Sequence, residues 1–404
     1  MSQAFSNEEQ RNIFKIATEL GLREKQVEAT VRLLDEGATI PFLARYRKEV
    51  TGSLDEVAIS VIRDRMEQLR ELDKRRESII RAIEEQGKMT NELLEKLIAA
   101  QTINELEDIY LPYKPKRRTR AAIAREKGLE PLANLLLDQE NIDIFAEAQK
   151  YISDEKQVKD VEEALAGARD IIAEKVNEDI EARQEIRILF EKKGTFVAKI
   201  IPGKEEEGAK YKDYFNWSEP VITAPSHRIL AMRRAEKELI ITLDVAPDEE
   251  EAIGLLEKRF VKKQNAAGEQ VALAVKDAYK RLMKPSMETE IRMMTKKKAD
   301  EEAIRVFAEN LRQLLLSPPM GQKRVLAIDP GYRTGCKVVC LDAQGKLLDD
   351  AVIYPNEPQR KVSEAGVIVR DLCKKYQIEA IAIGNGTASR ETEAFVRSLN
   401  IPNV

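Results

Sequence analysis

The hydrophobic pattern divides the chain into a long helical part and a shorter part rich in strands. Up to residue 316, apolar residues recur at spacings of three and four, which places them on one face of a helix. From residue 324, short apolar runs alternate with turn residues, the pattern of strands in a sheet. Pro318 and Pro319 separate the two parts, and a helix does not continue through consecutive prolines. We therefore predict that residues 321–404 form a separate domain.

The first 52 residues predict a small helical domain. Two helices end at Gly21 and Gly37, and a short third helix opens near Pro41 and is expected to end near Glu49. A helix, a glycine turn and a short helix give the outline of a helix-turn-helix.

Three basic residues of that third helix, Arg45, Arg47 and Lys48, are candidate contacts to nucleic acid. A recognition helix places groups that contact phosphate at such positions. The alternative is a charged helix face turned to solvent, which is the more common origin of this pattern.

Residues 53–320 predict a helical scaffold with a small strand-containing insert near residues 195–245. One helix is expected from about residue 157 to residue 193, and strands at 195–201 and 239–245 mark the insert.

A long helix is also expected at the start of this scaffold. Ser53 and Glu56 form a capping box for it, and it should reach about Gln86. The residues expected on its buried face are Leu54, Val57, Val61, Leu69, Leu72, Ile79 and Ile83.

The loop at residues 111–120 concentrates positive charge beside Tyr110 and Tyr113. Its prolines prevent a continuous helix. Basic groups beside aromatic rings can hold a phosphate backbone while a ring stacks on a base. The alternative is a loop that clamps onto acidic helices of its own chain, which contains 71 Asp plus Glu. The candidate contacts are Lys114, Lys116, Arg117, Arg118 and Arg120.

A basic helix beginning near His227 gives a third, weaker candidate surface, spanning Arg233 to Lys237. Just before it, residues 211–217 form the most aromatic segment and contain the only Trp. Because such side chains bury large areas, we expect this segment to pack against neighbouring helices.

The last part of the chain predicts an α/β domain. Three strands within residues 324–354 are expected to form an antiparallel meander, followed by a helix at 359–376, a strand at 380–383 and a helix at 389–399. This order is the opening of a ribonuclease H-like fold. The whole chain is therefore predicted to be mainly α, with a multi-helical N-terminal region followed by a partial α/β domain.

Asp329 ends the first strand of that domain. It precedes Pro330 and Gly331, so the carboxylate is presented at a strand end beside a turn. Loops that bind a metal or face a phosphate are often built in this way. Residues 381–386 show a similar pattern, in which apolar residues are followed by glycines.

Composition limits the classes of function. A hydrophobic content of 43% with 34% charged residues describes a soluble protein, and a net charge of -4 argues against a uniformly basic surface. Local basic patches remain compatible with that charge. One histidine excludes histidine-based metal sites and triads, and three cysteines are too few for a disulfide framework. We expect no cofactor and no bound metal.

The N-terminus and the hydropathy pattern bear on location. The N-terminus lacks the basic and apolar regions of a signal peptide, and no apolar run approaches the roughly 18 residues of a membrane span. We expect a cytoplasmic protein with no membrane partner.

Several stretches resemble a known family. Residues 329–335 (DPGYRTG) and 383–386 (IGNG) look like a YqgF/RuvC-like domain. Residues 39–52 (TIPFLARYRKEVTG), 111–118 (LPYKPKRR) and 225–228 (PSHR) are similar to stretches of the Tex family of bacterial transcription accessory proteins.

This resemblance implies a cytoplasmic nucleic-acid-binding factor related to a eukaryotic transcription elongation factor. It implies a helical N-terminal region with a helix-turn-helix, a YqgF-like domain, helix-hairpin-helix motifs and an S1 domain. The present chain reaches Val404. We therefore expect a fragment of a longer protein, ending inside the YqgF-like domain and lacking the last two modules.

Two enzymatic functions are compatible with the fold. A RuvC-like nuclease needs several converging carboxylates, but Gly384 and Asn385 stand where a second acid is expected, and Glu391 and Glu393 are weak substitutes. We therefore expect no catalysis and treat Asp329 as a vestigial candidate.

An actin-like nucleotide hydrolase could approach phosphates through backbone N–H groups at Thr334, Gly335, Gly384 and Gly386, although Pro330 counts against it.

Binding of RNA or DNA through the basic patches is the function that needs the fewest specialised residues. Such patches give salt-dependent affinity with weak sequence selectivity. A protein scaffold that contacts RNA polymerase or ribosomes through the helical region is the remaining alternative.

Overall fold

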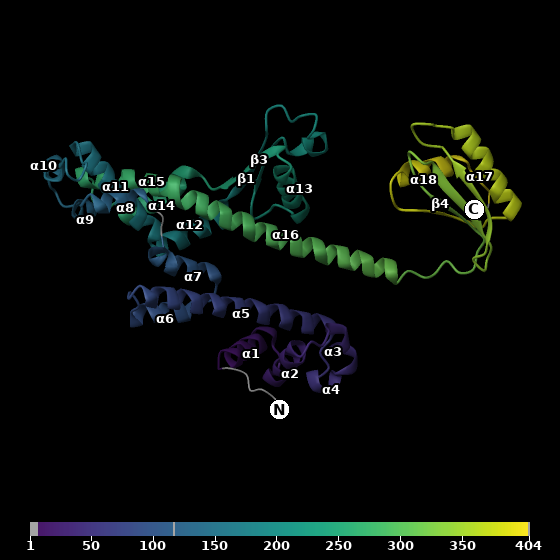
Figure 1. The fold of residues 1–404 in the computed structure, drawn as a ribbon, viewed down its shortest axis with the longest axis horizontal. Coiled ribbons are helices and arrows are strands. Elements are labelled where there is room, and N and C mark those ends of the chain that lie inside the picture. The colour runs from purple at the N-terminus through teal and green to yellow at the C-terminus, as the bar shows by residue number, and fades with distance from the viewer. Residues whose placement is uncertain (1–6, 116–117, 403–404) are drawn as a thin grey trace. The chain divides into compact units, whose positions relative to one another are not determined.

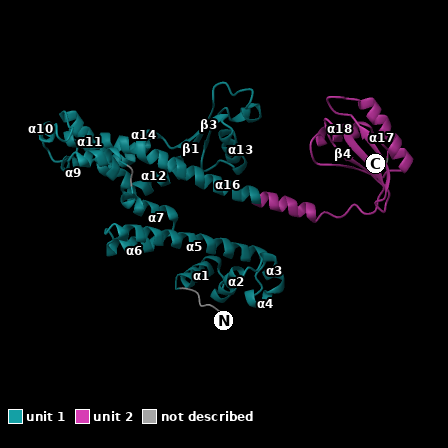
Figure 2. Ribbon diagram, viewed as in Figure 1, with its two compact units in different colours: residues 1–304 teal, residues 305–404 magenta. Residues whose placement is uncertain are grey.

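The computed structural model describes residues 7–115 and 118–402, which form two compact units (Figure 2). Unit 1 comprises residues 1–304 and unit 2 residues 305–404. The division falls inside the long helix α16, Lys284–Leu315, ahead of the two prolines where the sequence predicts a boundary. The domain bounds at residues 52 and 320 stay predictions.

The described part of unit 1 begins with helices that share one core (Figure 1). Ile16, Val27, Leu43 and Ile59 are fully buried in it. The second helix, the turn at Gly37 and the third helix form the predicted helix-turn-helix outline. The helices are α1, Asn7–Leu20; α2, Glu24–Asp35; α3, Ile40–Tyr46; α4, Lys48–Thr51; and α5, Glu56–Glu85.

Two details of this region differ from the sequence prediction. The third helix does not continue to Glu49, because the backbone at Arg47 leaves the helical conformation and separates α3 from α4. The predicted capping box at Ser53 is wrong. Ser53 has a φ of 63°, and Asp55 caps α5 by accepting a hydrogen bond of 2.8 Å from the backbone N–H of Ala58.

This change of cap goes with a different buried face at the start of α5. Val57 and Val61, which the sequence places in the core, are 70% and 41% exposed. Ile59 and Ile62 are buried in their place. Further along the helix, the predicted core positions Leu69, Leu72, Ile79 and Ile83 are confirmed.

The middle of unit 1 is built around α11, which packs against α8, α9 and α15. Asp179 ends α11 and caps α12 by accepting from the backbone N–H of Ala182 at 2.8 Å. The single helix predicted from residue 157 to residue 193 is therefore wrong. The elements here are α6, Asn91–Ala99; α7, Ile103–Tyr110; η1, Leu111–Tyr113; α8, Arg120–Glu126; α9, Glu130–Asp138; α10, Ile144–Gln149; α11, Val161–Glu178; and α12, Ile180–Lys193.

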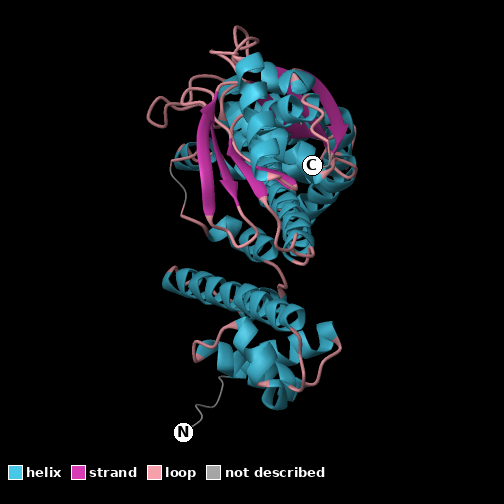
Figure 3. Ribbon diagram, turned by 90° about the vertical axis from the view of Figure 1, so that its right-hand side faces the viewer, coloured by secondary structure: helices cyan, strands magenta, loops and turns pink. Residues whose placement is uncertain are grey.

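A small antiparallel sheet in unit 1 contains strands at both places where the sequence predicts them. Figure 1 labels β1 and β3, and Figure 3 colours the strands of both units magenta. The strand order of this sheet is β2-β1-β3, and the sequence prediction missed β2. The segment rich in aromatic residues forms η2 and the start of β2. The elements are β1, Thr195–Ile200; η2, Ala209–Tyr214; β2, Asn216–Pro220; α13, Ser226–Lys237; β3, Ile241–Ala246; α14, Glu249–Phe260; and α15, Ala266–Asp277.

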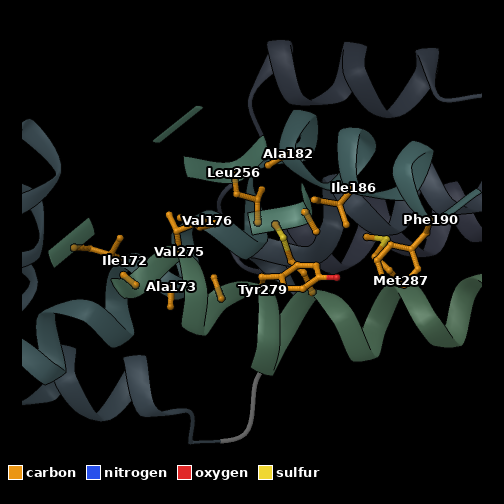
Figure 4. Close-up of a cluster of buried hydrophobic side chains, with 14 of the residues drawn as sticks. Ile172, Ala173, Val176, Ala182, Ile186, Phe190, Leu256, Val275, Tyr279 and Met287 are labelled. Carbon is orange, nitrogen blue, oxygen red and sulfur yellow. The ribbon is translucent and has the colours of Figure 1, made fainter. Parts of the chain in front are cut away.

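The π-helical segment η3, Ala278–Met283, joins α15 to α16 and brings Tyr279 into the core of unit 1. Tyr279 lies in the cluster of buried apolar side chains drawn in Figure 4, which includes Phe190 and Met287. Its hydroxyl is buried, and no described residue forms a hydrogen bond with it.

Unit 2 confirms the predicted α/β order of three strands, a helix, a strand and a helix. Its sheet has the order β6-β5-β4-β7, with β4 antiparallel to β5 and parallel to β7. This is the arrangement of a partial ribonuclease H-like domain. The elements are β4, Val325–Asp329; β5, Cys336–Leu341; β6, Leu347–Ile353; α17, Val362–Tyr376; β7, Ala380–Ile383; and α18, Ser389–Ser398.

Candidate nucleic-acid interface

The basic residues of α3 and α4 lie together on an exposed surface. Leu43 and Ala44 are 0% and 3% exposed and face the core, so the residues that follow them turn outward. Arg45, Arg47 and Lys48 are all exposed. The structure therefore brings these three predicted contacts together.

Acidic neighbours do not bury these cations. The guanidinium of Arg45 lies 3.9 Å from the Glu56 carboxylate, and that of Arg47 lies 3.9 Å from Glu49. The Arg45 and Arg47 side chains remain 68% and 47% exposed. Exposed ion pairs contribute about 0–1 kcal/mol, so a phosphate can replace the carboxylate at little cost.

Two aromatic side chains share this surface, and the sequence prediction did not include them among the candidate contacts. Phe42 is 42% exposed and Tyr46 is 69% exposed, with ring centroids 5.7 Å apart. The Arg47 guanidinium lies 5.9 Å from the Phe42 ring centroid. The signal that could have found them is the spacing of four residues, which places both rings on one side of α3.

The loop at residues 111–120 presents cations too, although acidic residues of the flanking helices α7 and α8 engage two of them. Lys114 lies 3.7 Å from Glu107, and Arg118 lies 3.0 Å from Glu126. Lys116 and Arg117 lie outside the described residues. Arg120 is exposed in the first turn of α8.

Neither tyrosine beside these cations is an exposed ring, although the sequence suggested that they stack on a base. Tyr110 is 7% exposed, and the Arg75 guanidinium covers its ring at 5.7 Å from the centroid. Tyr113 is half-buried against the same core cluster. The loop therefore offers charge, without an exposed ring among its described residues.

Two arginines of the basic helix α13 make contacts within unit 1. Arg228 pairs with Glu219 at 2.7 Å and lies 5.2 Å from the Trp217 ring centroid. Arg233 pairs with Glu236 at 2.6 Å and is one-quarter exposed. This surface is the weakest of the three candidates, because Arg234 and Lys237 are the only exposed cations of α13 within the described residues. Trp217 is partly buried against the core, as predicted for the aromatic segment.

Asp329 stands at the exposed end of β4, beside Gly384. The Gly384 N–H donates to the Ile328 carbonyl at 2.9 Å, and a Cβ at Gly384 would lie 3.8 Å from Asp329 Oδ1. A glutamate at this position would bring a second carboxylate to Asp329, whereas glycine brings none.

The other acids considered from the sequence have different partners. Glu393 pairs with Arg397 at 2.8 Å. Glu391 accepts a hydrogen bond from Tyr332; partial desolvation, followed by this carboxylate, raises the pKa of Tyr332. Among the described residues, no group of three or more His, Cys, Asp or Glu side chains could hold a metal ion.

The Asp329 loop is joined to a buried polar cluster through Cys336, whose Sγ donates to the Gly331 carbonyl at 3.9 Å. The Asn356 side-chain amide donates to Thr392 Oγ1 at 3.0 Å, and Cys336 Sγ lies 3.6 Å from the same hydroxyl. Residues on β5, on α18 and in the loop after β6 are thereby fixed relative to one another. Sequence spacing gives no signal for this cluster, because the three residues are far apart in the chain.

The hydropathy of the described helices indicates no membrane-spanning segment. Within residues 7–115 and 118–402, no helix combines the length and the apolar character needed to cross a membrane.

Comparison with protein families matches three successive stretches of the chain. Residues 10–84 match a Tex-like protein N-terminal domain, residues 139–307 a Tex central region-like family, and residues 323–402 a Tex protein YqgF-like domain. The chain belongs to the Tex family. The family resemblance of the sequence motifs is thereby confirmed, and so is the partial ribonuclease H-like fold of the last domain.

Curated Tex relatives align along almost the whole chain. Protein tex of Bordetella pertussis is 42% identical over 96% of this chain, and the transcriptional accessory protein Tex of Neisseria gonorrhoeae is 40% identical over 96%. The human S1 RNA-binding domain-containing protein 1 is 30% identical over 92%. The alignments cover 51%, 51% and 38% of these relatives, so the chain spans about half the length of the two bacterial proteins.

Proposed function

We propose that this Tex-family chain binds RNA or DNA as a transcription accessory factor in the cytoplasm and performs no catalysis. The observation that carries the proposal is the exposed group of Arg45, Arg47 and Lys48 on α3 and α4. The cations of the loop at residues 114–120 add a second contact to the phosphate backbone. The printed names of the relatives, with transcription in one and RNA binding in another, support the same function.

The chemistry of this interface is electrostatic. Each cation that meets a phosphate releases a condensed counterion, so affinity depends on the number of contacts and on salt. The contacts fix the backbone and do not read base edges. We further propose that RNA polymerase or the ribosome is the protein partner, reached through the helical region.

Charge-neutralising variants test the interface. One variant carries Arg45→Gln, Arg47→Gln and Lys48→Gln, and a second carries Lys116→Gln, Arg117→Gln and Arg118→Gln. We expect each to lower the affinity for a labelled RNA or DNA oligonucleotide about tenfold or more at low salt, measured by fluorescence anisotropy.

The control changes an equal number of basic residues elsewhere. Lys296, Lys297 and Lys298 on α16 are three consecutive basic residues, and replacing all three by Gln removes the same charge. The control should retain the wild-type affinity. Equal losses in all three variants would mean that overall charge, and not these surfaces, determines binding.

The absence of catalysis is tested at Asp329. Two-metal cleavage needs several carboxylates around ions roughly 4 Å apart, and Gly384 supplies none beside Asp329. We expect single-stranded and branched substrates to remain intact with Mg²⁺ or Mn²⁺, and Asp329→Ala to behave like the wild type. Metal-dependent cleavage that is lost in Asp329→Ala would establish a nuclease instead.

A further inference from the structure

The exposed rings of α3 are not explained by phosphate contacts. Single exposed apolar residues are common on protein surfaces. Here Phe42 and Tyr46 lie next to each other, with ring centroids 5.7 Å apart, and both are within the same short segment as three exposed cations. Such a combination of π-faces and positive charge is the chemistry that holds unpaired bases.

The geometry of α3 disfavours reading of a duplex groove. Recognition helices direct their N-terminal residues at base edges. In this chain the first turn of α3 lies beside α5, because Ile40 and Pro41 line the same hollow as Met66 and Arg70 of that helix. The helix has seven residues, about 10 Å, and it ends at the break at Arg47.

The cations and the Tyr46 ring are placed at the other end of the helix. Arg45 and Tyr46 are in the last turn of α3, and Arg47 and Lys48 follow at the break. Tyr46, at 69% exposed, is the more accessible ring, while Arg47 partly covers Phe42. A base can therefore approach Tyr46 while the adjoining phosphates meet the cations.

We propose that Tyr46, supported by Phe42, stacks on an unpaired base, so that α3 and α4 form a binding site for single-stranded nucleic acid. This inference rests on the proposed function, since Arg45, Arg47 and Lys48 supply the contacts to the backbone. Stacking requires an accessible base, whereas the electrostatic contacts require only phosphates.

Two substitutions at Tyr46 separate stacking from charge. Tyr46→Ala removes the ring and leaves every cation in place, and we expect it to weaken binding of a single-stranded 12-mer about tenfold. Tyr46→Phe keeps the ring and should retain wild-type affinity. Phe145→Ala is the matched control, because Phe145 is also an exposed aromatic residue, at 61%, and it lies on α10 away from the basic residues in sequence.

Two further probes test the base directly with the full chain. An oligomer of the same length with abasic sites has the phosphates without the bases, and it should bind wild type and Tyr46→Ala equally. A duplex of the same sequence keeps its bases stacked internally, so wild type should bind it more weakly than the single strand. The salt dependence of binding should be the same for wild type and Tyr46→Ala, since no cation is lost.

The outcomes distinguish this inference from the proposed function. If neutralising Arg45, Arg47 and Lys48 weakens binding while Tyr46→Ala changes nothing, the stacking site is wrong and the phosphate interface stands. Tighter binding of the duplex than of the single strand would also overturn the stacking site. If neither variant changes the affinity, the proposed interface on α3 and α4 is wrong. If Tyr46→Ala abolishes binding of a purified protein partner and leaves oligonucleotide affinity unchanged, the rings dock protein and the inference fails.

Discussion

At the scale of single residues, Tyr279 shows how the core of unit 1 tolerates a polar atom. The residue is fully buried, and its hydroxyl forms no hydrogen bond with a described residue. Burial, with smaller effects from Glu249 and Asp248, raises the pKa of Tyr279 from 10.0 to about 12. The neutral phenol is therefore the form that the folded protein holds.

This shift predicts a loss of stability in alkali. The unfolded chain releases the phenol proton near pH 10, whereas the folded chain holds it until about pH 12. The unfolded state binds fewer protons in that interval, so the free energy of unfolding falls as pH rises through it, by an amount on the order of 2 kcal/mol.

The variant Tyr279→Phe removes the titrating group and the unpaired hydroxyl together. At pH 7 we expect it to be as stable as wild type or slightly more stable, because no hydrogen bond is lost. Between pH 10 and pH 12 it should lose less stability than wild type. Urea unfolding at pH 7 and pH 11 measures both effects, and a large loss at pH 7 would show that the hydroxyl has a partner.

Residue-scale burial also explains which parts of the candidate site the sequence could predict. The exposure of Arg45, Arg47 and Lys48 follows from the helical pattern, since they lie opposite apolar positions. The burial of Tyr110 does not follow from any local pattern, because it depends on how α7 packs against α5. Tyr46 was overlooked because an aromatic residue in a helical pattern is normally assigned to the core.

At the scale of elements, an ionic network joins three helices of unit 1. Asp108 of α7 accepts from Arg183 and Arg187 of α12, each at 2.6 Å, and Arg187 also pairs with Glu290 of α16 at 2.5 Å. The side chains of Asp108 and Arg183 are 5% and 7% exposed. Because these charges are buried, each depends on the others for compensation.

Removing one partner should therefore be costly. We expect Asp108→Ala to destabilise the protein by about 3–5 kcal/mol, because among the described residues it leaves the buried Arg183 without a carboxylate partner and Arg187 with Glu290 alone. The control is Glu92→Ala, which removes a fully exposed partner of Lys96 and should leave the unfolding midpoint nearly unchanged. Equal effects of the two substitutions in chemical denaturation would contradict a structural role for the network.

Sequence periodicity predicted most elements and failed at the breaks between collinear segments. The helical spacing continues across Arg47 and Asp179, so one helix was predicted where the structure has two. The short strand β2 was missed because its five residues are only half-buried, and it pairs with β1 through tertiary register. In unit 2 every strand was found, because each is short, contains apolar residues and is bounded by turn residues.

At the scale of the whole molecule, the sheet order β6-β5-β4-β7 explains why Asp329 and Gly384 are neighbours. Parallel strands β4 and β7 end at the same edge, with Ile328 opposite Ile383. The fold thus places Asp329 beside the position of Gly384, where the sequence supplies no second carboxylate. The site that we propose for nucleic acid lies instead in unit 1, on α3 and α4.

The central claim is that the cations of α3 and α4 contact phosphate, and the salt dependence of binding tests it most directly. The measurement is the slope of the logarithm of oligonucleotide affinity against the logarithm of salt concentration, for wild type and for the variant with Arg45→Gln, Arg47→Gln and Lys48→Gln. Three lost contacts to a single strand predict a slope that is shallower by about 2. An unchanged slope would contradict the account.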